Sequence, residues 1–134
     1  MGLISKPLTT KIYSILNEDA TLSALVSGVF TFVCDTQDFP YIRIDDVSPE
    51  DFGAHDIDGF QGTVQINVFH QTRSRIEVHT IQERIYQLLH NIDLELVDFP
   101  TINFRCNLSR VDTEKDNVTL HGVQQFNYIF GGQK

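Results

Sequence analysis

Residues 63–91 read TVQINVFHQTRSRIEVHTIQERIYQLLHN, and this stretch decides the fold. Its first part, 63–69, alternates between apolar and polar side chains, the pattern of a strand with one buried face. Ser74 and Glu77 then form the capping-box pattern of a helix start, and apolar residues beyond them recur every three or four positions. We therefore predict a strand followed by a long helix over about 75–91. The apolar stripe of this helix comprises Val78, Ile81, Ile85, Leu88, Leu89 and Ile92.

The segment before this strand predicts two short helices and two further strands. Apolar residues at helical spacing follow Pro7, which suits a first helical turn, and continue to about Asp19. A second short helical piece follows, with Asp19 or Thr21 as a cap and Gly28 just past its end. The β-branched and aromatic runs at 29–33 and 41–44 are typical of strands.

After the long helix, the pattern indicates a hairpin. Residues 102–109 alternate between apolar and polar side chains, and a turn-rich stretch follows at 112–117. The next strand is predicted over 119–130, with a phase break near Gly122. Its aromatic face carries Phe126, Tyr128 and Phe130. Residues 131–134 are predicted to form a polar tail.

These elements indicate the α+β class. Strands outnumber helices, and they do not alternate with helices as a parallel sheet requires. We expect an antiparallel or mixed sheet with one long amphipathic helix packed on one face and two short N-terminal helices. The 134 residues, 41% hydrophobic and 21% charged, predict a single folded domain over 1–134.

The chain is acidic, with 18 Asp and Glu against 10 Lys and Arg and a formal charge of −8. This charge repels phosphates and anionic lipids, so stable binding to DNA, RNA or a membrane is not expected. There is no leader pattern and no apolar run of about 18 residues, which predicts a soluble, cytosolic product. The two cysteines, Cys34 and Cys106, are interpreted as buried thiols.

A segment over about 45–62 combines acidic residues with Pro49 and several glycines, which predicts a long, flexible, acidic loop. Its carboxylates are Asp45, Asp46, Glu50, Asp51, Asp56 and Asp58. Two interpretations stay open. The loop is either merely solvated, or it faces an interface or the lumen of a ring, where it repels the phosphates of passing DNA.

Polar residues also mark the last strand, where Gln124, Gln125 and Asn127 are interpreted as lying opposite the aromatic residues. The favoured interpretation is an inner strand with one polar face. The alternative is an edge strand that contacts another subunit.

No catalytic, cofactor or metal site is predicted. The histidines are His55, His70, His79, His90 and His121, which we interpret as surface or boundary residues. His79 and His90 lie about 16 Å apart along the predicted helix and cannot share an ion. The run from Asp56 to Asp58 lacks the other ligands of a calcium loop, and there is no nucleophile elbow or phosphate-binding loop. We therefore do not expect an enzyme. The competing hypothesis is a small hydrolase that uses His55 and Asp56.

The order of these elements resembles a phage family. The stretches that carry the resemblance are Ile12-Tyr13 with Leu16, Asp19 with Leu22, Leu25–Phe30, Phe39–Ile44, the strand ending near Phe69, Ile85-Tyr86 with Leu88-Leu89, and Gly122–Phe126. Together they extend over nearly the whole chain. They resemble the siphophage family of tail completion, or tail-to-head joining, proteins, which are tail terminators. The chain is particularly similar to the family's member from a lytic Bacillus siphophage.

This resemblance implies a structural virion protein that catalyses no reaction. Copies would form a ring of six on the tip of the tail tube, stop its elongation and join the tail to the DNA-filled head. The implied partners are the tail tube protein and a head completion or connector protein, while genomic DNA passes through without stable binding. We expect a monomer in free solution, assembly in the host cytoplasm and a final position at the head–tail interface. A head-completion or connector role and a small host-protein-binding adaptor are the alternatives.

Overall fold

The computed structural model describes residues 5–31, 37–51, 59–96 and 101–131. Its elements in chain order are α1 (Ser5–Asn17), α2 (Ala20–Ser23), β1 (Val29–Phe30), β2 (Tyr41–Asp51), β3 (Gly59–His70), α3 (Arg75–Leu89), β4 (Ile92–Leu94), β5 (Ile102–Thr113) and β6 (Leu120–Gly131). One six-stranded sheet has the order β1-β2-β3-β6-β5-β4. β1 is parallel to β2 and the other neighbouring pairs are antiparallel, which confirms the predicted combination of helices with a mixed sheet. None of the described helices is long and apolar enough to cross a membrane.

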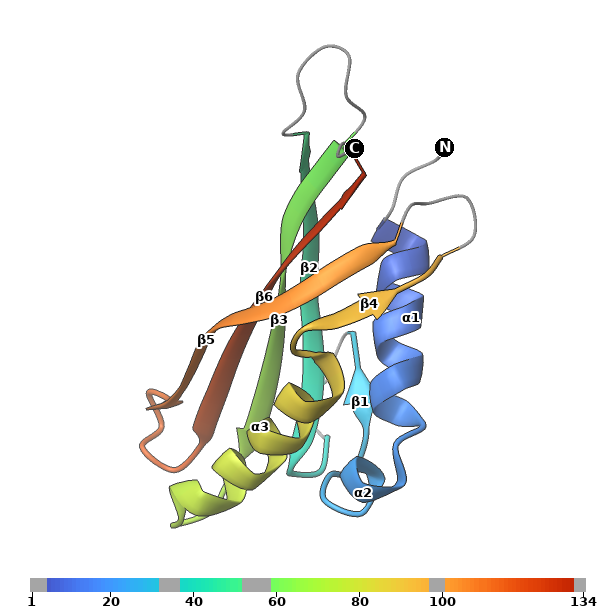
Figure 1. The fold of residues 1–134 in the computed structure, drawn as a ribbon. Helices are drawn as coiled ribbons and strands as arrows, with labels where there is room; N and C mark the ends of the chain where they lie inside the picture. The colour runs from blue at the N-terminus through green and yellow to red at the C-terminus, as the bar shows by residue number, and fades with distance from the viewer. Residues whose placement is uncertain (1–4, 32–36, 52–58, 97–100, 132–134) are drawn as a thin grey trace.

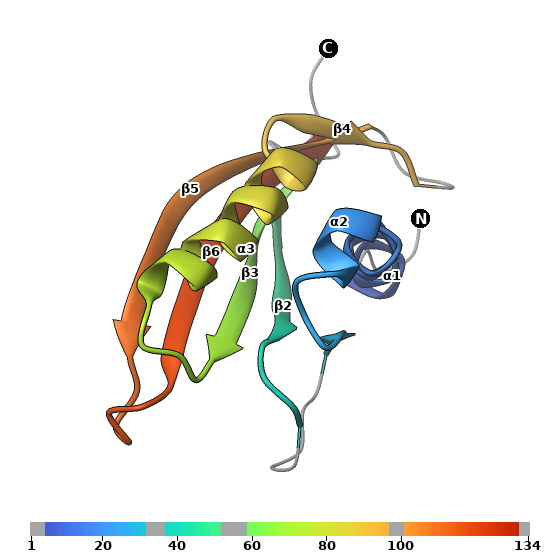
Figure 2. The same ribbon diagram turned by 90° about the horizontal axis from the view of Figure 1, so that it is seen from below.

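The sheet is curled, and the helices lie on its concave side (Figures 1 and 2). α3 packs against β3, β5 and β6, whereas α1 packs against β1 and β2. Strand side chains alternate between the two faces of the sheet, so one face of each long strand supplies the core. The largest fully buried side chains are Tyr128, Phe104, Phe126, Leu8, Ile12, Leu16, Leu22, Ile42, Ile66, Ile85, Leu89 and Ile102. Each contributes about 1.5–3 kcal/mol by burial, before the entropy of ordering the chain is subtracted.

α3 begins where the sequence predicts. Ser74 is its N-cap and accepts a hydrogen bond from the Ile76 backbone amide at 3.2 Å. The reciprocal half of the capping box does not form. The Glu77 carboxylate contacts the His70 ring at 2.7 Å, and the Ser74 amide donates to the Thr72 hydroxyl at 3.3 Å. The start of the helix therefore fastens it to the end of β3.

α3 ends at Leu89, earlier than predicted. Asn91 has a positive φ of 57°, and its backbone amide donates to the Phe104 carbonyl at 2.7 Å. This contact leads into β4, which the sequence did not predict, and it moves Ile92 from the helical stripe into the sheet. α3 has 15 residues and α1 has 13, so the expectation of one long helix is not confirmed.

The predicted loop over 45–62 must be corrected at both ends, because β2 continues to Asp51 and β3 begins at Gly59. The two strands pair as an antiparallel ladder with one register shift just after Asp45. Ladder hydrogen bonds satisfy the backbone of both segments, which outweighs the low strand propensity of Asp, Gly and Pro. Residues 52–58 lie outside the described residues, so a flexible loop there stays a prediction.

β5 continues to Thr113, into the stretch 112–117 that the sequence assigned to the turn, so the turn to β6 is tighter than predicted. Asp116 closes this turn. Its carboxylate accepts hydrogen bonds from the backbone amides of Val118 at 2.9 Å and Thr119 at 2.8 Å. The Thr119 hydroxyl and these amides lower the pKa of Asp116.

Two further predictions lie partly outside the described residues. β1 is shorter than the strand predicted over 29–33, and residues 32–36 are not described. Gly131, the start of the predicted polar tail, ends β6, and residues 132–134 are not described.

Gly122 sets how closely α3 approaches the sheet. A Cβ at this position would lie 2.7 Å from Gln82 Nε2 and 2.8 Å from Val78 Cγ1. β3 and β6 pair through Gly122 without a register shift, so the predicted phase break is wrong. The shift in this part of the sheet lies in β5, between Cys106 and Leu108. The glycine therefore serves close packing of helix on strand and not a bulge.

Asp19 joins α2 to α3. Its carboxylate caps α2 by accepting from the Leu22 amide at 2.8 Å, and it accepts two hydrogen bonds from Arg84 on α3, at 2.9 and 2.6 Å. Only 12% of the Asp19 side chain is exposed, so the contact is partly shielded from water. The hydrogen bond from Arg84 holds the pKa of Asp19 below its ordinary value of 3.8.

Replacing Asp19 by alanine should lower the free energy of unfolding by about 1–2 kcal/mol for the lost cap, with a further loss from the broken Arg84 contact. Because the folded-state pKa is lowered, this stabilisation is present above the unfolded pKa and is lost as pH falls through the folded pKa. Urea unfolding of both proteins should therefore show a gap at about pH 7 that shrinks towards about pH 3. The control is Glu18→Ala, at an exposed neighbouring position. An equal loss in both variants, or a gap independent of pH, would contradict the assignment.

Candidate interaction surfaces

The acidic residues that the sequence placed in one loop are divided by the structure. Asp46, Glu50 and Asp51 belong to the part of β2 that leads to the end of the β2–β3 hairpin. Asp56 and Asp58 lie outside the described residues. Figure 1 shows this end of the hairpin at the opposite end of the sheet from α2 and the β5–β6 turn. The backbone therefore places Glu50 and Asp51 at one end of the molecule, whereas Asp46 lies beside the register shift.

Asp45 belongs to a hydrogen-bonded network on the convex face of the sheet. Arg43 donates two hydrogen bonds to its carboxylate, each 2.9 Å long, and Asn67 donates a third at 2.8 Å. Asn67 is fully buried. Its side-chain oxygen accepts from Gln65 at 2.8 Å and contacts the His121 ring at 2.7 Å. The Asp45 carboxylate is thus used within the sheet and does not act as a freely solvated charge.

Two histidines connect elements of the fold. His121 contacts the Glu114 carboxylate at 2.9 Å, and its ring stacks on Phe69 with 4.3 Å between the centroids. His90 accepts a hydrogen bond from the Cys106 backbone amide at 2.9 Å. Both rings therefore have structural contacts in the layer between core and solvent, as the sequence predicts.

The described residues hold no group of three or more His, Cys, Asp or Glu side chains arranged to bind a metal ion. Cys106 is half-buried, not fully buried as predicted, because it lies at the margin of the core. Burial raises the pKa of its thiol, which disfavours the nucleophilic thiolate. Cys34, His55 and Asp56 lie outside the described residues, so the hydrolase hypothesis built on His55 and Asp56 stays untested.

β6 is an inner strand that pairs with β3 on one side and β5 on the other. The inner position of this strand is confirmed and the edge-strand alternative is wrong, because both sides of its backbone are used in the sheet, but Gln124 does not belong to the polar face. Gln124 faces α3, is 1% exposed and donates to the Gln82 carbonyl at 3.1 Å. Gln125 and Asn127 face the convex side and hydrogen-bond with side chains of β3. Contact of these side chains with another subunit stays a prediction.

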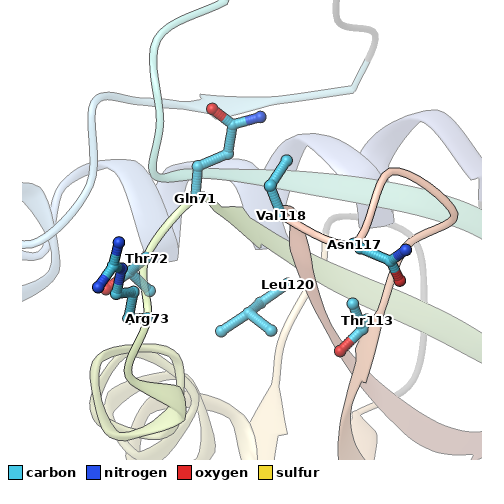
Figure 3. A pocket seen from close by; sticks show the side chains of 7 residues that line it. All are labelled: Gln71, Thr72, Arg73, Thr113, Asn117, Val118 and Leu120. Carbon is cyan, nitrogen blue, oxygen red and sulfur yellow. The ribbon is translucent and has the colours of Figure 1, made fainter.

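An open pocket of about 500 Å³ lies where the β3–α3 connection meets the β5–β6 turn (Figure 3). Its lining residues are Gln71, Thr72, Arg73, Thr113, Asn117, Val118 and Leu120. Arg73 has no ion-pair partner in the described part of the chain, and Val118 is 56% exposed. Among the described residues, none of those that line the pocket is a carboxylate, histidine or cysteine. The sequence did not predict this pocket, because its two sides come from segments far apart in the chain.

Comparisons with known proteins identify the family and the fold. The family described as tail completion protein gp17 matches residues 10–131. A chain from the virion of a native gene transfer agent particle has a TM-score of 0.86 at 16% identity, over 98% of this chain and 100% of that chain. The bacteriophage SPP1 gp17 protein has a TM-score of 0.62 at 22% identity, over 96% of this chain and 95% of that chain. A comparison with curated protein sequences gives no match.

At these identities the two solved structures establish a shared fold, whereas the sequence match establishes the family. The resemblance found in the sequence is confirmed, since the match extends from within α1 to the end of β6. The chain belongs to the tail completion protein gp17 family, whose members are structural proteins of the virion.

Proposed function

We propose that this tail completion protein is a tail terminator: copies form a ring of six on the end of the tail tube, stop its elongation and join the tail to the DNA-filled head. The family match over residues 10–131 carries the proposal. The gene transfer agent virion supports it, because one chain of that particle has this fold over its whole length. The partners are the tail tube protein on one side of the ring and a head completion or connector protein on the other.

The distribution of surface groups supports a protein that acts by docking. The helices cover the concave side of the sheet (Figure 2). The 500 Å³ pocket offers the cationic Arg73 on one side and the exposed, apolar Val118 on the other (Figure 3), on a chain whose formal charge is −8. A local positive charge and an apolar contact favour one orientation of a complementary neighbour. This end of the molecule is therefore a candidate contact with an adjacent tail protein.

Electrostatic repulsion favours assembly on a template. Copies that each carry a formal charge of −8 repel one another in solution. A finished tube end can hold several copies side by side and so raise their effective concentration. The ring therefore forms on the tube from monomers.

The acidic end of the β2–β3 hairpin faces the channel through which the genome passes. The carboxylates concerned are Asp46, Glu50, Asp51, Asp56 and Asp58. Asp45 is excluded, because its carboxylate is engaged within the sheet. Repeated around a ring, these charges repel DNA phosphates and prevent the genome from binding the channel wall.

Phage produced without this protein should yield filled heads and separate tails, many of them overlong, because the tube has no cap. Negative-stain electron microscopy of lysates measures both the joining and the tail length. Supplying the wild-type chain in trans is the control and should restore joined particles. Tails of normal length beside heads that have lost their DNA would favour the head-completion alternative, and normal complete virions would remove the assignment.

Neutralising carboxylates near the hairpin end should leave particles intact but slow genome release about tenfold or more, because DNA then adheres to the channel. The substitutions are Glu50→Gln, Asp51→Asn, Asp56→Asn and Asp58→Asn. The matched control removes the same number of carboxylates at exposed positions outside the hairpin. Its substitutions are Glu18→Gln, Asp38→Asn, Asp93→Asn and Glu95→Gln. Triggered DNA release from purified particles provides the rates, and equal rates for the two variants would exclude a channel position for the hairpin end.

A further inference from the structure

A second, smaller pocket lies between one flank of α3 and the sheet. Its volume is about 210 Å³, below the range of roughly 300–1,000 Å³ of sites for drug-sized ligands. Its lining residues are His79, Gln82, Glu83, Tyr86, Ser109 and Gln124. The four helical residues lie at spacings of three and four, which places them along one side of α3. Ser109 comes from β5 and Gln124 from β6, so three elements of the core form the site.

Two buried amides in this pocket have oxygen atoms without a donor. Gln82 is 3% exposed and Gln124 is 1% exposed. The Gln82 amide nitrogen donates to the Arg110 carbonyl at 3.0 Å, and that of Gln124 donates to the Gln82 carbonyl at 3.1 Å. Because a carbonyl can only accept, these contacts fix the orientation of both amides. Neither Oε1 atom receives a hydrogen bond from the described residues.

This arrangement is costly for a structural role alone. A buried acceptor without a donor is destabilising, whereas an apolar side chain of similar shape would avoid this cost. Two such acceptors adjoin each other here, since the Gln124 amide contacts the backbone of Gln82 itself. A pair of unsatisfied oxygen atoms at one pocket indicates a hydrogen-bond donor supplied from outside the chain.

The surroundings select a cationic and planar donor. Glu83 adds a carboxylate to the lining, and no lysine or arginine is among the described lining residues. Tyr86, 40% exposed, adds an aromatic ring, which attracts a cation. A guanidinium group presents several N–H donors in one plane and stacks on aromatic rings, whereas an ammonium group is a compact, strongly hydrated charge. The acidic chain as a whole also favours a basic partner.

We propose that this pocket binds the guanidinium group of an arginine from a neighbouring protein of the particle. The identity of the neighbour as a virion protein rests on the proposed function, but the recognition of guanidinium by the two glutamines does not. Arginine insertion gives each orphan oxygen a donor and pairs the cation with Glu83.

The guanidinium part is tested by NMR titration of the isotope-labelled chain with ethylguanidinium, which corresponds to the end of an arginine side chain. The side-chain amide signals of Gln82 and Gln124 should shift and saturate, with a Kd on the order of millimolar. Ethylammonium should bind at least tenfold more weakly. No saturable shift of these two signals, or an equal response to ethylammonium, would overturn the proposal.

Variants locate the binding. Gln124→Met should weaken ethylguanidinium binding at least tenfold with little change in the thermal unfolding midpoint, because removal of a buried unpaired oxygen offsets loss of the hydrogen bond to the Gln82 carbonyl. Gln125→Met is the matched control: it changes the next residue, on the convex face, and should bind like the wild type. An undiminished affinity of Gln124→Met would overturn the assignment.

A second pair of variants tests the same pocket if Gln124→Met does not fold. Glu83→Gln removes the carboxylate of the pocket and should weaken binding several-fold, whereas Glu95→Gln makes the same charge change at an exposed position outside it. Equal affinities of these two variants would contradict the role of Glu83. In the particle, Gln124→Met should leave heads and tails unjoined or tails overlong. Normal particles from a variant that no longer binds ethylguanidinium would refute the virion partner, while loss of the whole chain would still test the terminator role.

Discussion

Helix α3 lies directly on β6 because position 122 has no side chain; a Cβ there would come within 2.7 Å of Gln82. At this separation the Gln82 amide reaches the Arg110 carbonyl of β5 at 3.0 Å and fastens the helix to a second strand. The apolar stripe of α3 is then buried against β3, β5 and β6. Without this contact the concave face of the sheet would remain in water, and the curled sheet would lack the layer that stabilises it.

The same contact determines where the chain can interact. The helices cover the concave side of the sheet, and a hydrogen-bonded network lies on the convex side. The surfaces that remain for contacts with other proteins lie at the ends of the sheet and beside α3. One pocket adjoins the start of α3 and includes Arg73; the other follows its flank and includes Gln82 and Gln124. The acidic end of the β2–β3 hairpin lies at the opposite end of the sheet (Figure 1). A single small body thus presents chemically different surfaces in different directions, which suits the proposed role between a tube and a head.

Local sequence patterns predicted the features that local interactions control. Alternation over 63–69 predicted the interior of β3, because it defines a strand with one buried face. Ser74 predicted the start of α3, because a single capping residue marks where a helix begins. The extension of β2 and β3 through acidic and glycine-rich residues was not predicted, since it depends on pairing between strands. β4 was missed because it depends on pairing with β5, a separate segment of the chain. The pockets were missed for the same reason, and the family was predicted only from the order of motifs along the chain.

The central claim is that copies of the chain assemble into a ring on the end of the tail tube. It is tested most directly by sedimentation of the purified chain, alone and with isolated tail tubes, followed by electron microscopy of the tube ends. The account predicts that the chain sediments as a monomer by itself, and that with tubes it sediments with them and forms a ring at one end. Stable rings in dilute buffer without tubes, or a chain that never associates with tube ends, would contradict it.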